Sequence, residues 1–279
     1  MATDDRPSRR RDFQIAIICA LPLEYDAASL LVDEFWDQDG KQYGRTSGDM
    51  NTYRNGRIGM HDVVLMLLPN MGKAAVAGST ASLRTSYPSL KLAFLVGVCG
   101  GVPSLSTHEA LLGDVVIGEA MVQYDFGRQY PSGFIPKEMV EGDVGAPNKD
   151  ICSLIAYFKT EPGREDLRRN TAIHLKALQD VAVNKRYQCN YQYPGFAEDK
   201  LFAATYLHKH RGPQSCDLCC GEIEMFCDKA ARASCAELGC DEGQLQEEVQ
   251  GPKIYIGRIA SGDIVMKSGD SENRHQKIT

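Results

Sequence analysis

Short apolar runs separated by polar or glycine-containing segments dominate the first third of the chain. Residues 15–21 (IAIICAL) and 61–69 (HDVVLMLLP) are typical of strands that are buried on both faces of a sheet. Residues 90–103 (LKLAFLVGVCGGVP) read as a further apolar strand that runs into a glycine-rich loop. Strand character returns at 115–117 and 121–123, and again at 254–266.

Helical segments lie between these strands. Pro22 suits the first position of a helix, and residues 24–31 continue it. Residues 74–83 form a second helix, whose small side chains allow close packing on a sheet, and residues 147–182 read as helical in two pieces. Strands that alternate with helices predict an α/β fold whose sheet is covered on both faces.

Two local signals complete the pattern. The sequence YRNGRI, residues 53–58, contains the Asn-Gly pair that marks a β-hairpin turn. The sequence Glu161-Pro162-Gly163 marks the break between the two helical pieces. We therefore expect a turn inside the first segment and a boundary at the second.

Composition limits the class of protein. The 279 residues are 43% hydrophobic, which suits one sizeable core or at most two small ones. The net charge of -6 argues against a nucleic-acid partner. No apolar run reaches the roughly 18 residues that a membrane span needs, and the amino terminus lacks a secretory signal. We expect a cytoplasmic protein with no membrane partner.

The predicted domain covers most of the chain. Residues 1–12 are polar and read as a disordered tail, residues 13–270 as one domain, and residues 271–279 as a divergent tail. Within the domain, residues 184–252 form a polar, cysteine-rich insertion whose apolar content is too low for a core of its own.

Six of the ten cysteines lie between Cys216 and Cys240. We expect reduced thiols packed in loops and no metal. The alternative is a structural zinc site, because His208-x-His210 precedes a Cys-x-x-Cys pair; the later pair, Cys235 and Cys240, is more widely spaced than usual.

The glycine loop Gly97–Gly101 lacks the sequence signature of a dinucleotide-binding turn and of a P-loop. Its glycines lack the G-x-G-x-x-G spacing, no helix follows, and no P-loop sequence occurs in the chain. Two interpretations remain open. The loop is a tight turn that needs positive φ angles, or its backbone approaches a small ligand at the carboxyl end of a strand.

Several motifs occur in a fixed order: IAIICALPLEYDA, PNMGKAAVAGSTASL, LAFLVGVCGGVP, LLGDVVIGEAMVQYDFG and GRIASGDIVMKSG. This set resembles the nucleoside phosphorylase and nucleosidase superfamily, and within it the fungal branch found at the amino terminus of NLR-like signalling proteins. The resemblance implies a three-layer α/β/α domain with a mixed, partly closed sheet, incomplete at its carboxyl end. It also implies cleavage of the N-glycosidic bond of purine-type nucleosides without a cofactor, by phosphate in phosphorylases and by water in nucleosidases. Homo-oligomers are common in the family, and NTPase, ankyrin or TPR modules often follow in the fungal branch.

The resemblance assigns roles to particular residues. Glu24 stands in place of a phosphate-binding arginine and Val98 in place of a phosphate-binding serine, which favours hydrolysis with Glu24 orienting the water. The implied substrate-binding residues are Val98, Cys99, Gly100, Gly101, Ser261, Asp263, Val265 and Met266. Two alternatives stay open: Glu24 as an acid favoured by the dipole at a helix start, and Asp263 as an acid that bonds its own turn.

Two features of the family are missing from this sequence. They are a Met-Glu pair that holds the ribose hydroxyls and a later aspartate that protonates the purine. We expect a fragment, a shifted reading frame or a short form without activity. The competing function is therefore a nucleoside-sensing or signalling module that has lost turnover.

Overall fold

The computed structural model describes residues 6–39, 43–100, 104–105, 108–109, 112–131, 133–136, 147–195, 202, 206–211, 216, 218–219, 227–240 and 251–263. The chain divides into two compact units. The first unit comprises Met1–Cys99, Lys149–Gln192 and Ser261–Asp263, and the second comprises Gly100–Asn148, Tyr193–Ala260 and Ile264–Thr279. One boundary between them falls inside the glycine loop. The prediction of one domain with an insertion stays a prediction.

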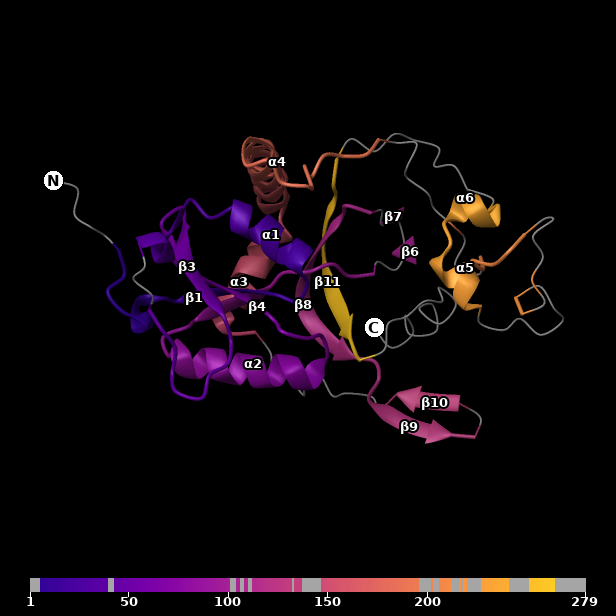
Figure 1. The fold of residues 1–279 in the computed structure, drawn as a ribbon, viewed down its shortest axis with the longest axis horizontal. Coiled ribbons are helices and arrows are strands. Elements are labelled where there is room, and N and C mark those ends of the chain that lie inside the picture. The colour runs from indigo at the N-terminus through magenta and orange to yellow at the C-terminus, as the bar shows by residue number, and fades with distance from the viewer. Residues whose placement is uncertain are drawn as a thin grey trace. The chain divides into compact units, whose positions relative to one another are not determined.

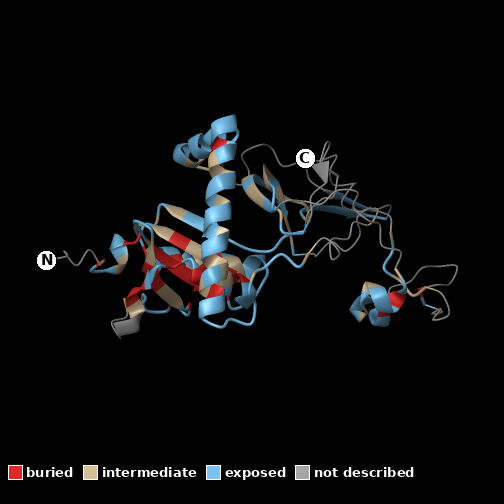
Figure 2. Cartoon of the chain, turned by 90° about the horizontal axis from the view of Figure 1, so that it is seen from above, coloured by how far each residue is buried: buried red, intermediate tan, exposed pale blue. Residues whose placement is uncertain are grey.

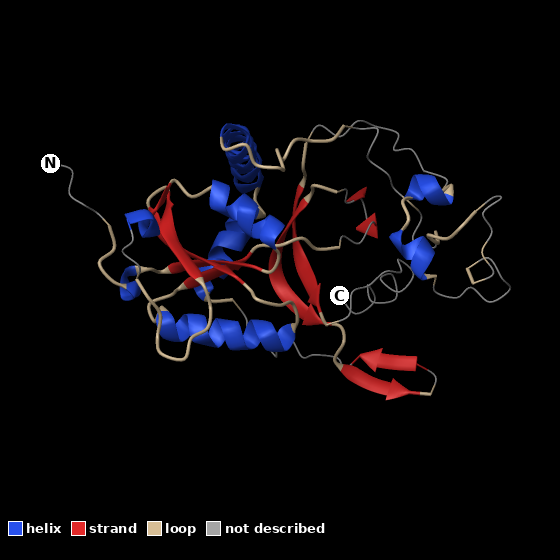
Figure 3. Ribbon diagram, viewed as in Figure 1, coloured by secondary structure: helices blue, strands red, loops and turns tan. Residues whose placement is uncertain are grey.

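A five-stranded mixed sheet organises the first unit (Figure 3). Its strands are β1 (Ile15–Cys19), β2 (Glu34–Phe35), β3 (Tyr53–Ile58), β4 (His61–Leu67) and β5 (Leu92–Leu95), in the order β2-β3-β4-β1-β5. Strand β1 is parallel to both β4 and β5, whereas β3 is antiparallel to β2 and β4. The α/β class and the three apolar strands predicted from sequence are confirmed.

Four helices belong to this unit: α1 (Pro22–Leu30), α2 (Lys73–Ser86), α3 (Lys149–Phe158) and α4 (Glu161–Asn184). Helices α1 and α2 lie on opposite faces of the sheet (Figure 1). On β4, Met66 faces a core cluster with Leu83 of α2, while its neighbour Leu65 faces another with Ala28 of α1. Successive strand residues point to opposite faces, so this alternation covers the sheet on both sides, as predicted. Figure 2 shows the buried residues gathered in this region.

The break between α3 and α4 lies two residues earlier than predicted. The Thr160 hydroxyl oxygen accepts a hydrogen bond from the Gly163 N–H at 3.2 Å and caps α4. Glu161, Pro162 and Gly163 therefore form the first turn of α4. Proline is tolerated there because N–H groups in the first turn have no partner within the helix.

The predicted hairpin turn at Asn55-Gly56 is wrong, because both residues lie inside strand β3. A Cβ on Gly56 would lie 2.6 Å from the Glu34 carbonyl oxygen of the neighbouring strand, so a side chain has no room there. Asn55 is buried, and its side-chain oxygen accepts a 3.0 Å hydrogen bond from the Tyr87 hydroxyl. The Asn-Gly pair serves packing across the sheet and not a turn.

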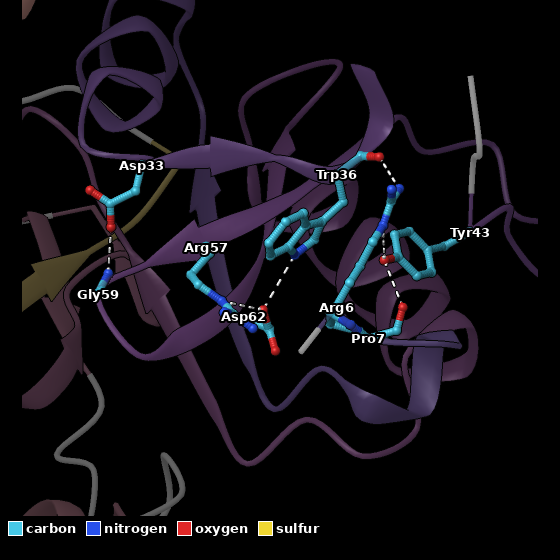
Figure 4. Close-up of polar contacts among 8 residues, drawn as sticks. All are labelled: Arg6, Pro7, Asp33, Trp36, Tyr43, Arg57, Gly59 and Asp62. Carbon is cyan, nitrogen blue, oxygen red and sulfur yellow. Dashed lines mark hydrogen bonds and ion pairs between the residues drawn. The ribbon is translucent and has the colours of Figure 1, made fainter. Parts of the chain in front are cut away.

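The turn between β3 and β4 occurs at Gly59, which has a φ of 58°. Its N–H donates to the Asp33 carboxylate at 2.6 Å (Figure 4). Beside it, Arg57 and the indole N–H of Trp36 both donate to Asp62, at 3.2 and 3.3 Å. These contacts hold the buried Trp36 against the β3–β4 end of the sheet.

Contacts with the sheet begin before residue 13. Arg6 donates to the Trp36 carbonyl oxygen and, at 3.3 Å, to the Tyr43 hydroxyl (Figure 4). The Tyr43 hydroxyl donates to the Pro7 carbonyl oxygen at 2.9 Å. Residues 6–12, expected to belong to a disordered tail, therefore include an anchored segment, with the 3-10 turn η1 (Arg10–Asp12); a second 3-10 turn, η2 (Trp36–Asp39), follows β2.

The second unit contains short paired strands and two short helices. They are β6 (Ser104–Leu105), β7 (His108–Glu109), β8 (Val115–Gln123), β9 (Gly127–Tyr130), β10 (Gly133–Pro136), α5 (Asp228–Arg232), α6 (Cys235–Leu238) and β11 (Ile254–Ser261). Strand β8 pairs with β11, β9 with β10 and β6 with β7. The Asp114 carboxylate, just before β8, accepts a hydrogen bond from the Lys253 N–H at 2.8 Å. Within the described part of the chain, no helix has the length and apolar character needed to cross a membrane.

Candidate active site

Glu24 links two loops at one edge of the sheet. Its Oε2 accepts hydrogen bonds from the N–H groups of Ala20 and Leu21, at 2.9 and 2.8 Å, just after β1. Its Oε1 accepts from the Val98 N–H at 2.7 Å, in the glycine loop that follows β5. Because β1 and β5 are parallel, both loops leave the same edge of the sheet. The carboxylate is 7% exposed, so it joins these loops almost out of contact with solvent.

Gly97 lies against this carboxylate. A Cβ at Gly97 would lie 2.9 Å from Glu24 Oε1, closer than carbon and oxygen approach without strain. Gly97 is also not among the glycines with a positive φ. The backbone of the glycine loop therefore comes close to Glu24. That the loop also approaches a small ligand stays a prediction.

The three hydrogen bonds from described residues leave one acceptor position of the Glu24 carboxylate unfilled. An ionised carboxylate has about four acceptor positions on its two oxygens. The described residues fill both positions on Oε2 and one on Oε1. One position on Oε1 is left for a small donor such as water.

The neighbouring thiol is unsuited to act as a nucleophile. Cys19, at the end of β1, is fully buried. Burial, together with the nearby charge of Glu24, raises the pKa of the Cys19 thiol to about 11. The thiol therefore stays protonated at neutral pH.

The remaining predicted loop residues are only partly described. Val98, Cys99 and Gly100 are exposed. Val98 contacts Glu24 through its backbone N–H, whereas the sequence analysis considered only its side chain. Gly101, Val265 and Met266 lie outside the described residues.

Asp263 binds the start of a helix. Its Oδ1 accepts from the Lys73 N–H at 2.9 Å at the amino terminus of α2, and Oδ2 lies 3.4 Å from the Lys73 ammonium nitrogen. The contact with Lys73 differs from both roles considered for Asp263 from the sequence, a bond within its own turn and a contact with substrate. The helix dipole favours a carboxylate at this position. Ser261 ends β11, two residues earlier.

Two groups of cysteines and histidines in the second unit bring together atoms that bind metals. The first group contains His210, Cys216, Cys219 and Cys227, and the second contains His208, Cys235 and Cys240. In each group the candidate ligand atoms all lie within 4.8 Å of one another. Backbone N–H groups of Leu218 and Cys219 hydrogen-bond to the Cys216 sulfur and lower the pKa of its thiol.

The first unit is an α/β domain with a mixed sheet, and the buried Glu24 lies where two of its parallel strands end. Open α/β sheets in general bind ligands at the carboxyl ends of their strands. A family model described as the phosphorylase superfamily matches residues 14–162, more than half of the chain, and the chain belongs to that superfamily. The family predicted from the ordered motifs is thus confirmed.

Individual relatives agree with this assignment. An NLR-like protein of Hyaloscypha variabilis is 33% identical over 96% of this chain, which spans only 24% of that relative's length. A 5'-methylthioadenosine/S-adenosylhomocysteine nucleosidase of Mycobacterium bovis is 29% identical over 44% of the chain and 45% of its own length. Among solved structures, such a nucleosidase from Neisseria meningitidis, in complex with methylthio-immucillin-A, is 19% identical, covers 51% of this chain and 56% of its own and has a TM-score of 0.37. The predicted likeness to NLR-like proteins is confirmed as well.

Proposed function

We propose that this chain is a nucleosidase-type domain that hydrolyses the N-glycosidic bond of purine-type nucleosides, with Glu24 orienting the attacking water. The observation that carries the proposal is the position of the Glu24 carboxylate, which occupies the loop edge where β1 and β5 end. Family membership and the nucleosidases among the relatives support the type of bond that is cleaved.

The contacts of Glu24 favour water over phosphate as the nucleophile. The Val98 N–H donates to Glu24, so this loop amide is already engaged by an acid of the chain itself. A phosphate dianion placed beside the buried carboxylate would be repelled, whereas water can donate to the remaining position on Oε1. Glu24 then holds the water and accepts its proton as the bond to the base breaks.

A second candidate function is a nucleoside-sensing or signalling module. It is supported by the NLR-like relative, of which this chain corresponds to only a quarter, and such a module would work fused to NTPase, ankyrin or TPR modules. Release of free base from adenosine, inosine, guanosine or methylthioadenosine, measured with and without phosphate, distinguishes the two functions. Release without phosphate supports the nucleosidase; strict dependence on phosphate contradicts hydrolysis, and binding without release favours the sensor.

The role of Glu24 is tested by Glu24→Gln, which keeps the shape of the side chain. Loss of a general base lowers the rate about 100-fold or more. Glu161→Gln is the matched control, because Glu161 is an exposed acid in the first turn of α4. If Glu24→Gln lowers thermal stability but leaves base release unchanged, Glu24 is only a helix-start acid and the proposed mechanism is wrong.

A further inference from the structure

Among the described residues from His208 to Cys240, thiol and imidazole groups make up much of what packs together. The buried cluster of this segment consists of Cys219, Cys227, Ala230 and Leu238. Of these described residues, Ala230 and Leu238 are the ordinary apolar ones, and their apolar surface is far less than an independent core needs. The sulfur atoms point toward one another and toward histidine rings, although a neutral thiol is a poor hydrogen-bonding partner.

Distances in the first group lie near those of tetrahedral zinc coordination. Zinc with bonds of about 2.3 Å to sulfur and 2.0–2.1 Å to nitrogen requires sulfur atoms about 3.8 Å apart and sulfur–nitrogen distances of about 3.6 Å. The Cys216 and Cys227 sulfur atoms are 3.9 Å apart. His210 Nδ1 lies 3.2 Å from the Cys219 sulfur and 4.0 Å from that of Cys227.

A disulfide does not account for this arrangement. The Cys216–Cys227 sulfur distance of 3.9 Å is far beyond the bonded distance of about 2.05 Å. None of the described cysteines belongs to a disulfide bond. Three thiols and one imidazole form one of the standard ligand sets of a structural zinc site.

The second group carries an independent sign of metal binding. His208 Nδ1 lies 3.8 Å from the Cys235 sulfur and 3.7 Å from the Cys240 sulfur. Its other ring nitrogen, Nε2, lies 3.0 Å from the Ala233 carbonyl oxygen and can donate to it. That bond leaves the lone pair on Nδ1 directed at the sulfur atoms, as metal-binding histidines usually show.

Local structure explains how the wide Cys235–Cys240 spacing still brings two sulfur atoms together. Ser234 and Glu237 form a capping box that starts the single turn α6 at Cys235. Gly239, with a φ of 67°, ends that turn, and the Cys240 N–H donates to the Cys235 carbonyl oxygen at 2.9 Å. The turn therefore places both sulfur atoms on the side of His208.

We propose that these residues form two zinc sites, a complete Cys₃His site at His210, Cys216, Cys219 and Cys227, and a Cys₂His site at His208, Cys235 and Cys240. The second site leaves one position of a tetrahedral zinc to a further ligand such as water. Both sites are structural and independent of the nucleosidase proposal, since they lie in the second unit and Glu24 in the first. This reverses the expectation from sequence that the cysteines only pack in loops.

The test is the zinc content of the purified full chain, measured by mass spectrometry of the metal. Two groups of ligands predict about two zinc ions per chain. Cys227→Ser should lose one of them and Cys235→Ser the other, while the control Cys189→Ser, an exposed cysteine of the first unit, should retain both. A content near zero overturns the proposal, and zinc that both ligand variants retain is adventitious and overturns it as well. A wild-type content of one zinc ion that Cys235→Ser does not lower overturns the second site alone.

A second measurement covers variants that fail to fold. The wild-type chain is stripped with a chelator and reloaded with Co²⁺, whose visible absorption reports tetrahedral thiolate coordination. Trp36, the single tryptophan, is buried in the first unit, so its fluorescence shows whether that unit stays folded. The expected result is a reversible cobalt spectrum with unchanged Trp36 fluorescence; absence of thiolate absorption would contradict both sites.

Discussion

The sheet of the first unit and the cysteine–histidine groups of the second are stabilised in different ways. The sheet buries apolar side chains on both faces, with Met66 and Leu65 of one strand in two separate clusters. The cysteine–histidine segment gathers sulfur and ring nitrogen atoms around two apolar residues. In the sheet, stability is spread over many contacts, whereas in the segment it depends on a few ligands and, in our proposal, on metal.

The largest effect expected within the first unit is that of Met66→Ala. Met66 is fully buried on β4, and removing its side chain leaves a cavity that costs about 2–5 kcal/mol of unfolding free energy. Met60→Ala is the matched control, because Met60 is 83% exposed at the turn before the same strand. Urea unfolding followed by Trp36 fluorescence measures both variants. Equal stabilities would contradict the sheet core as described, and a loss of zinc in Met66→Ala would contradict the separation of the two regions.

A smaller effect is expected from Asp49→Asn in the buried polar network beneath α2. The Asp49 carboxylate accepts from the hydroxyls of Ser86 and Tyr53, at 2.5 and 2.7 Å, and from the Asn51 N–H at 2.9 Å. Burial alone would raise the pKa of Asp49, but these hydrogen bonds outweigh it and hold the pKa below its usual range. Hydrogen bonds to a charged group are worth about 1.5–3 kcal/mol each, so the variant should lose stability of that order at pH 7.

The pH dependence of that loss follows from the direction of the pKa shift. A carboxylate whose pKa is lower in the folded state stabilises the protein above its unfolded value of about 3.9. This contribution disappears as the pH falls through the folded value. The difference in unfolding free energy between wild type and Asp49→Asn should therefore be full at pH 7 and smaller near pH 3. The exposed Asp26→Asn is the control, and a difference that grows toward low pH would contradict the assigned hydrogen bonds.

The sequence predicted the sheet better than the site because the two depend on information of different range. Apolar runs such as 15–21 and 61–69 reveal buried strands locally. The turn predicted at Asn55-Gly56 was wrong because Gly56 is required by a contact distant in sequence. A side chain there would collide with the Glu34 carbonyl oxygen of another strand. At the site, Glu24 was recognised by its motif, but its bond to the Val98 backbone could not be, since every residue except proline has an N–H group. The sequence suggested one zinc site as an alternative, but it could not show two groups, since His208 and His210 are two residues apart and lie in different groups.

The smallest effect is expected at Asp263, which holds the amino terminus of α2 from the surface of the first unit. Its side chain is 51% exposed and that of Lys73 is 42% exposed, so solvent weakens the contact. Asp263→Ala should lower the unfolding free energy by about 0.3–1 kcal/mol, and added salt should reduce this difference. Asp263→Asn, which keeps an oxygen for the Lys73 N–H but removes the charge, should lose less. The family resemblance instead places Asp263 near the substrate, and the KM for nucleoside release separates these roles. An unchanged KM in both variants with the small stability loss fixes Asp263 as a helix-capping acid, whereas a raised KM at unchanged stability makes it a substrate-binding residue.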